Sequence, residues 1–381
     1  MMPAPRRSRR KWILLAVFAG LLLAAAWWVD RQLEPHRLTA LVLEKSGASL
    51  ALDLSFDGDP DYVFRPEPRL RIPNLVVRDH ADGKLLLSAK LADISLPWAT
   101  ITGGEPVITR IELDHPMLDL PTLRRWQAAR PPAPFKLPTL LHGIHARSGT
   151  VQDEGYRVTN LDFDLPRLRE NEPASAKASG RFSEGETVID FDIDARIATP
   201  GLASDFGLRA SGSLQRSPTP LAFKADLDGR YQSTDAGLSV ATGSLSFAGD
   251  SPLPRMNGKA QVLVAEKLGA SFDGVLRDWP RDWPSLPAPL PEQATDLTLR
   301  VSYQGSRSFT DPIHLHLEKN STSVDATMRL ADIQDWMATP EGTPLPPLSA
   351  TVTTPRIELD GIRLEGVEVE LHPDEVTGNP P

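Results

Sequence analysis

The chain has 381 residues, 36 prolines, no cysteine and a net charge of −9. The lack of cysteine excludes a disulfide framework and a cysteine-based metal site. The first 30 residues hold five of the 41 basic and one of the 50 acidic residues, which leaves a net charge of −13 on the remainder. Such an acidic body repels nucleic-acid phosphates and anionic lipid surfaces, so we expect no nucleic-acid partner and no membrane adhesion by charge.

The N-terminus joins a basic cluster within residues 1–11 to an uncharged run, Trp12–Val29. As a helix this run spans about 27 Å, close to a hydrocarbon core of about 30 Å. Trp12 at one end and Trp27 and Trp28 at the other fit an aromatic belt. The pattern predicts a cytoplasmic tail over 1–11, a transmembrane helix over 12–29 and a body on the far side of the membrane.

A cleaved signal peptide is the alternative for this N-terminal segment. Residues 24–26 are three alanines, an acceptable small-residue cleavage site, and residues 8–14 resemble a twin-arginine signal. Both interpretations deliver the body to the same side of the membrane.

From residue 48 onward, apolar and polar residues alternate with the period of a strand that has one wetted face. Asp-Gly pairs that favour turns stand at 57–58, 82–83, 228–229 and 273–274. The spacing predicts about twenty antiparallel strands or slightly more. Short helices are expected only at 31–45, 121–129 and 332–337, and proline-rich stretches at 130–138, 280–291 and 339–347 indicate linkers or rim loops.

Motifs for catalysis are absent: the sequence has no glycine-rich phosphate loop, no H-E-x-x-H and no G-x-S-x-G. His314 and His316 share one strand face, and His142 and His145 are three apart, but both pairs fit solvated β-sequence better than a metal site. The alternating aspartates at 190, 192 and 194 lack the glycine and distal glutamate of an EF-hand loop and are interpreted as a polar strand face. We therefore predict no enzyme, no cofactor and no metal.

The remaining candidate site is the apolar strand face itself. Its candidate residues are Leu52, Leu54, Leu161, Phe163, Ile189, Phe191, Ile193, Phe223, Leu299, Val301, Leu315, Leu317 and Met328. Such a face must be covered by a second sheet, by its own curling or by a ligand, and periodicity alone favours a sandwich and an open groove equally.

The stretch 68–120 carries a more specific pattern. It reads PRLRIPNLVVRD, then an alternating strand at 85–96, then VITRIELDHPMLDL at 107–120, with Trp126 and an LPTLLHGIHARSGTV segment at 137–151 following. This order of strands resembles the N-terminal module of the AsmA family, inner-membrane-anchored periplasmic proteins of Gram-negative bacteria that are similar to bridge-type lipid carriers.

The resemblance implies an elongated, curled antiparallel sheet with an apolar inner face. It implies a module over 30–130, a continuing periplasmic body over 131–372 and a polar tail over 373–381. The expected function is binding or transfer of phospholipid along an apolar groove in support of outer-membrane lipid homeostasis, with a periplasmic or outer-membrane protein as a further partner. The alternative is a periplasmic scaffold for the assembly of outer-membrane proteins or for secretion, without lipid transport.

Overall fold

The computed structural model describes residues 47, 50–63, 67–95, 108–130, 137–215, 219–277, 279, 296–333, 347–359 and 362–372. The predicted tail over 1–11, the transmembrane helix over 12–29 with its three tryptophans, the helix over 31–45 and the tail over 373–381 lie outside these residues. Within the described ranges, no helix combines the length and the hydropathy that a membrane span requires.

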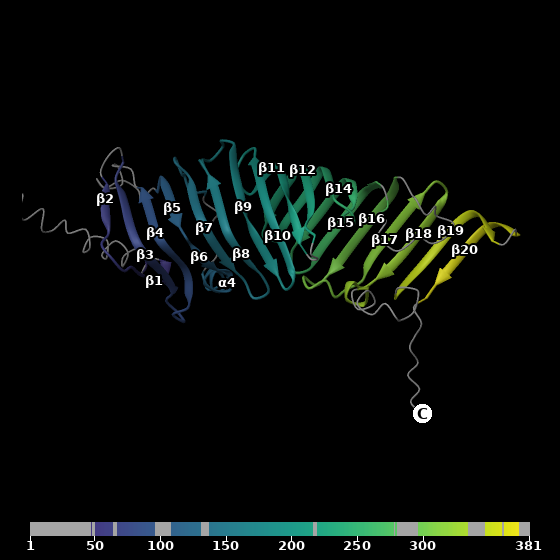
Figure 1. Cartoon of the computed structure of the whole chain (residues 1–381), viewed down its shortest axis with the longest axis horizontal. Coiled ribbons are helices and arrows are strands. Elements are labelled where there is room, and N and C mark those ends of the chain that lie inside the picture. Colours follow the sequence, from purple (N-terminus) through teal and green to yellow (C-terminus); the bar gives the residue numbers. More distant parts are fainter. Residues whose placement is uncertain are drawn as a thin grey trace, which may run out of the picture. The chain divides into compact units, whose positions relative to one another are not determined.

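The described residues are mainly β, as predicted, with twenty strands in one mixed, mostly antiparallel sheet and the helix α4 (Leu120–Ala128) (Figure 1). Its contacts divide it into two compact units. The N-terminal unit comprises 1–131 and 146–154, and the C-terminal unit comprises 132–145 and 155–381.

The N-terminal unit contains β1 (Leu52–Ser55), β2 (Asp61–Val63), β3 (Arg69–Asp79), β4 (Leu85–Ser95), β5 (Arg110–Asp114), β6 (Met117–Asp119) and most of β7 (Ile144–Gln152). The predicted turn at Asp82-Gly83 joins β3 to β4, with Gly83 at a φ of 67°. The pair β6–β7 is parallel, so the expectation of a purely antiparallel sheet is wrong at this point. A helix lies between these two strands in the sequence, and such a connection permits parallel pairing.

A closed apolar core holds this unit together. Leu70, Ile72, Leu75 and Val77 of β3 are buried and form a cluster with Leu86 and Ala92 of β4. Cross-strand neighbours extend this cluster along the register Leu54, Val77, Leu87, Leu118 and Val151. In β3 the buried apolar residues are Leu70 and Ile72 before Asn74, and Leu75 and Val77 after it, so the alternation shifts by one residue at Asn74.

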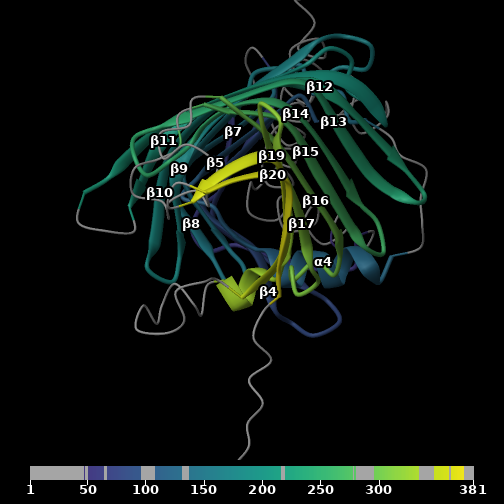
Figure 2. The ribbon, with the colours of Figure 1, turned by 90° about the vertical axis from the view of Figure 1, so that its right-hand side faces the viewer.

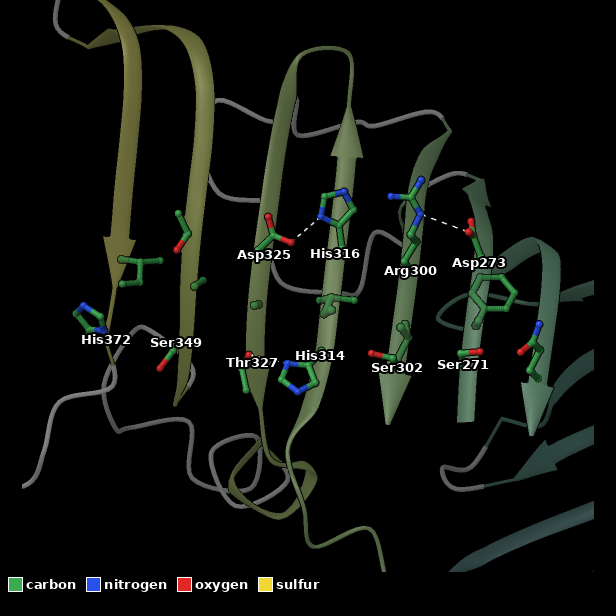
Figure 3. Close-up of a pocket in the computed structure, with 18 residues that line it drawn as sticks. Ser271, Asp273, Arg300, Ser302, His314, His316, Asp325, Thr327, Ser349 and His372 are labelled. Carbon is green, nitrogen blue, oxygen red and sulfur yellow. Dashed lines mark hydrogen bonds and ion pairs between the residues drawn. The ribbon is translucent and has the colours of Figure 1, made fainter. Parts of the chain in front are cut away.

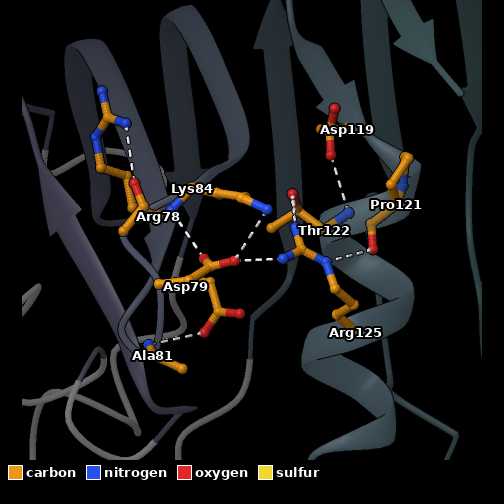
Figure 4. Close-up of polar contacts among 10 residues, drawn as sticks. Arg78, Asp79, Ala81, Lys84, Asp119, Pro121, Thr122 and Arg125 are labelled. Carbon is orange, nitrogen blue, oxygen red and sulfur yellow. Dashed lines mark hydrogen bonds and ion pairs between the residues drawn. The ribbon is translucent and has the colours of Figure 1, made fainter. Parts of the chain in front are cut away.

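Helix α4 packs on this core through Leu123 and Trp126. The Asp119 carboxylate accepts a hydrogen bond from the Thr122 backbone N–H at 2.9 Å and caps the helix N-terminus. Arg125 donates to Asp82 in the β3–β4 turn. It also donates to the Thr122 hydroxyl, and Figure 4 shows these two residues beside Asp119 and Pro121. The short helix predicted over 121–129 is thus confirmed, and it is fixed to the hairpin.

The C-terminal unit is a meander of long strands. They are β8 (Arg157–Leu165), β9 (Ala174–Glu184), β10 (Thr187–Ile197), β11 (Ala203–Gln215), β12 (Leu221–Thr234), β13 (Gly237–Gly249), β14 (Arg255–Val264), β15 (Leu268–Arg277), β16 (Leu297–Gly305), β17 (Ile313–Lys319), β18 (Thr322–Met328), β19 (Leu348–Leu359) and β20 (Ile362–Leu371). Each strand pairs antiparallel with the next. Figure 2 looks along this succession and shows that the sheet of this unit bends, with β8–β10 on one side and β15–β17 on the other.

Two of the predicted turns are wrong. Asp228-Gly229 lies inside β12 and Asp273-Gly274 lies inside β15. A Cβ atom on Gly229 would lie 2.4 Å from the Ala241 carbonyl oxygen, and one on Gly274 would lie 2.2 Å from the Asn257 carbonyl oxygen. Glycine at these positions therefore allows the neighbouring strand to approach closely. Of the helix predicted over 332–337, only the start is described, in a helical turn over 330–333.

Candidate functional site

Cross-strand register aligns apolar side chains into continuous rows on one face of the C-terminal unit. The first row takes one residue from each strand from β8 to β16: Phe163, Ala178, Ile193, Ala210, Ala225, Phe247, Met256, Leu276 and Leu297. Directly opposed residues of antiparallel strands share a face, so these nine side chains lie side by side.

A second row runs parallel to the first and is longer. It takes one residue from each strand from β9 to β20: Ala176, Ala195, Leu208, Leu227, Leu245, Gly258, Gly274, Leu299, Leu317, Val324, Val352 and Val369. No polar side chain interrupts it across twelve strands. A third row follows from β14 to β20 through Ala260, Phe272, Val301, Leu315, Ala326, Ala350 and Leu371. We call the surface formed by these rows the apolar face.

Most of the residues predicted from the sequence lie on this face. Phe163 and Ile193 are in the first row, Leu299 and Leu317 in the second, and Val301 and Leu315 in the third. Met328 lies opposite Ile313, which is two positions from the third-row residue Leu315 on the same strand. Ile189 and Phe191 lie on the same strand as the first-row residue Ile193, and Phe223 lies on the same strand as Ala225. Leu161 precedes Phe163 at a bulge in β8.

Leu52 and Leu54 have a different place. They pack against the core cluster of the N-terminal unit, opposite β3. The sequence pattern alone did not separate them from the residues of the C-terminal unit, because both sets alternate with the same period of two.

Exposure of the apolar face changes along the unit. On β8–β14 every member of the first two rows is half-buried. On β15–β19 the face is closed by a cluster of Leu276, Leu297, Leu317, Val324 and Val352, against which Trp279 packs. The predicted candidate Leu317 is therefore a core residue, 7% exposed, and Leu299 and Leu315 pack beside it. The accessible part of the face lies over β8–β14.

Several residues of the apolar face were missed by sequence reasoning. Leu245, Phe247 and Met256 belong to strands rich in serine, glycine and polar residues, where the alternation is weak. Their signal is the register: Phe247 lies opposite Ala225, and Met256 in turn lies opposite Phe247. Register depends on strand pairing, which the alternation of a single strand does not encode.

The opposite, polar face carries acid–base pairs between directly opposed residues. Arg181 Nε donates to Asp190 Oδ1 at 2.7 Å, Arg230 contacts Asp205 at 3.1 Å, and Arg209 contacts Asp226 at 3.4 Å. The Arg181 hydrogen bond lowers the pKa of Asp190 below its ordinary value. Solvent screens these exposed pairs, so they affect register and solubility more than stability.

A hollow of about 630 Å³ lies over the polar face between β14 and β20 (Figure 3). His314 and His316 point into it with Asp273, Arg300 and Asp325. His316 Nδ1 lies 2.6 Å from Asp325 Oδ1, and His314 contacts the Thr327 hydroxyl at 3.1 Å. Within the described ranges no three metal-binding side chains come together. In the second histidine pair, His145 Nδ1 lies 2.5 Å from Asp164 Oδ1 and His145 Nε2 lies 2.9 Å from the His142 carbonyl oxygen.

No protein-family model, no curated protein and no solved structure matches this chain significantly. The arguments on function therefore depend on the residues and their geometry.

Proposed function

We propose that this protein is a membrane-anchored periplasmic lipid carrier that binds phospholipid along the apolar face of its C-terminal unit. The observation that carries the proposal is the part of the second row on β9–β14, where the row has no polar side chain and its members are half-buried. In this proposal the sheet is an elongated, curled trough whose inner surface is the apolar face, and the bound lipid supports the lipid content of the outer membrane.

The exposure of the rows over β8–β14 supports an apolar ligand. A row that is half-buried on strand after strand leaves apolar surface in contact with water, which is unfavourable by about 25 cal/mol per Å². An acyl chain laid across the rows removes this surface, and each buried CH₂ contributes about 0.8 kcal/mol. The head group stays in water, because no charged side chain stands in the first or second row to bind it.

The chemistry of the face favours passive movement over tight binding. The row residues are alanine, glycine, leucine, valine, isoleucine, methionine and phenylalanine, and they contact an acyl chain by dispersion without directional bonds. An acyl chain shifted by one strand along a row meets similar side chains at each step. The membrane anchor predicted over 12–29 would place one end of the chain at a source of lipid.

Two adjacent residues of β13 give a matched test. Phe247 lies in the first row, whereas Ala248 lies on the polar face opposite Lys224. The full chain is purified from membranes, and the bound phospholipid is measured by mass spectrometry for the wild type, Phe247→Asp and Ala248→Asp. We expect the wild type and Ala248→Asp to carry lipid and Phe247→Asp to lose most of it.

A photoreactive acyl chain provides a second measurement that needs no variant. We expect crosslinks on row residues of β8–β14 and at Phe191. Wild-type protein without bound phospholipid, or crosslinks confined to the polar face, would overturn the proposal.

A scaffold for the assembly of outer-membrane proteins or for secretion is the second candidate. The closed cluster around Leu297 and Trp279 favours it, because this part of the apolar face is covered without a ligand. A scaffold predicts equal amounts of bound lipid in the Phe247→Asp and Ala248→Asp variants and protein crosslinks at the strand edges.

A further inference from the structure

Strand β20 ends the meander of the C-terminal unit (Figure 1). It pairs with β19 on one side, and no described strand pairs with its other side. Gly366 at a φ of 65° interrupts β20 and leaves a regular stretch, Val367–Leu371, which we call the edge segment. An open edge presents unpaired N–H and C=O groups and is a template for another strand.

The edge segment continues both faces of the sheet. Val369 lies opposite Val352 at the end of the second row, and it is 38% exposed. Glu368 and Glu370 lie on the polar face opposite Thr353 and Thr351, which are uncharged. The segment therefore offers apolar residues on one face and two carboxylates, two positions apart, on the other.

Neither carboxylate has a strong cationic partner. No ion pair among the described residues includes Glu368, and Glu370 contacts only the exposed His372, at 3.5 Å. Farther inside the unit, Asp190, Asp205 and Asp226 each lie opposite an arginine. In the described registers of this unit, no carboxylate lies opposite another carboxylate. Like charges directly opposed across strands are destabilising.

This charge pattern disfavours a second copy of the chain as the occupant. An antiparallel pairing of two edge segments centred on Val369 would place Glu368 opposite Glu370 twice. A head-to-tail pairing with β1 or β2 would bring Asp53 or Asp61 to the edge, and neither strand contains a basic residue. A strand that carries positive charge complements this edge best.

We propose that the edge segment binds a β-strand of another protein in which lysine or arginine alternates with apolar residues. The basic side chains of that strand would pair with Glu368 and Glu370, and its apolar side chains would extend the rows that end at Val369 and Leu371. Backbone hydrogen bonds would supply the affinity, and the alternating side chains would supply the specificity. This interaction is independent of lipid binding.

The test uses short blocked peptides and the full chain in detergent micelles. One peptide alternates valine with lysine, and a matched peptide alternates valine with glutamate. Binding is measured by fluorescence anisotropy. We expect the lysine peptide to bind about tenfold more tightly than the glutamate peptide, as two favourable cross-strand pairs imply. The double variant Glu368→Lys with Glu370→Lys should reverse the preference, whereas Glu184→Lys with Glu186→Lys, at the β9–β10 turn, should leave it unchanged.

Backbone pairing is tested with two lysine peptides that are N-methylated on alternate amides, in the two registers. Strand addition predicts that one of them loses binding and the other keeps it, because only one set of N–H groups faces the edge. Equal binding of the lysine and glutamate peptides, binding by both methylated peptides, or no binding would overturn the proposal. So would a dimer of the chain that the edge variants abolish, or peptide binding that begins only after removal of residues 373–381.

Discussion

Phe223 lies over Gly212 of the neighbouring strand. A Cβ atom on Gly212 would come within 3.0 Å of Phe223 Cζ and within 2.0 Å of the Asp190 carbonyl oxygen. Gly180 has the same relation to Phe191, with a distance of 3.2 Å to the ring. An aromatic ring beside a glycine of the neighbouring strand covers backbone that would otherwise be exposed.

Replacement of Gly212 by alanine should destabilise this part of the sheet. The new methyl group must displace the β10 backbone or the Phe223 ring, and such overpacking costs about 1–3 kcal/mol. Hydrogen exchange of β10–β12 measures the loss as faster exchange. Gly155→Ala is the control, since a Cβ atom there meets nothing within 4 Å and should leave exchange unchanged. Unchanged exchange in both variants would contradict the close approach at Gly212.

Two leucines of the apolar face should respond differently to truncation. Leu297 is fully buried in the cluster around Trp279, so Leu297→Ala should cost about 2–5 kcal/mol. Leu227 is half-buried in the open part of the face, so Leu227→Ala should cost about 1 kcal/mol. Chemical denaturation of delipidated protein measures both values. Equal costs would mean that the face is closed over β12 as well.

Alternation along the sequence was enough to predict the class of fold, the approximate number of strands and the face of residues such as Phe163 and Val301. The sequence of a single strand indicates which of its side chains share a face, because burial favours apolar residues at every second position. The same alternation could not distinguish Leu54, in the core of the N-terminal unit, from Leu227, because pairing between distant strands decides which core a residue joins.

The dipeptides at 228–229 and 273–274 show why local signals fail. Asp-Gly favours a two-residue turn in isolation. In the folded chain, Gly229 and Gly274 are instead required by the close approach of β13 and β14. The alternation also did not predict the closure of the apolar face near Leu317, because Trp279 packs against that cluster from outside any alternating run.

The cap of α4 should contribute measurably to the N-terminal unit. Asp119→Ala removes the acceptor for the Thr122 N–H and should cost about 1 kcal/mol. Faster hydrogen exchange in α4 would report this loss. Gln127→Ala, at an exposed position of the same helix, should leave exchange near that of the wild type. An equal effect of the two variants would show that the cap is not needed.

The contact between His80 and Asp53 should make the stability of the N-terminal unit depend on pH. His80 Nδ1 lies 2.8 Å from Asp53 Oδ1, and this hydrogen bond, with the charge of Asp53, raises the pKa of His80 above its ordinary value of 6.5. The folded state therefore binds the proton more tightly than the unfolded state does. The stabilisation is complete below the ordinary pKa and is lost as the pH rises through the raised pKa.

Thermal unfolding at pH 6 and at pH 8.5 tests this dependence. We expect the wild type to unfold at a higher temperature than His80→Gln at pH 6, and the difference to shrink at pH 8.5. Asp53→Asn should remove the same pH dependence, because the carboxylate is its cause. Both charges are exposed, so the difference at pH 6 should also decrease with added salt. A gap between the wild type and His80→Gln that stays constant with pH would show that His80 stabilises the unit by packing and not by its charge.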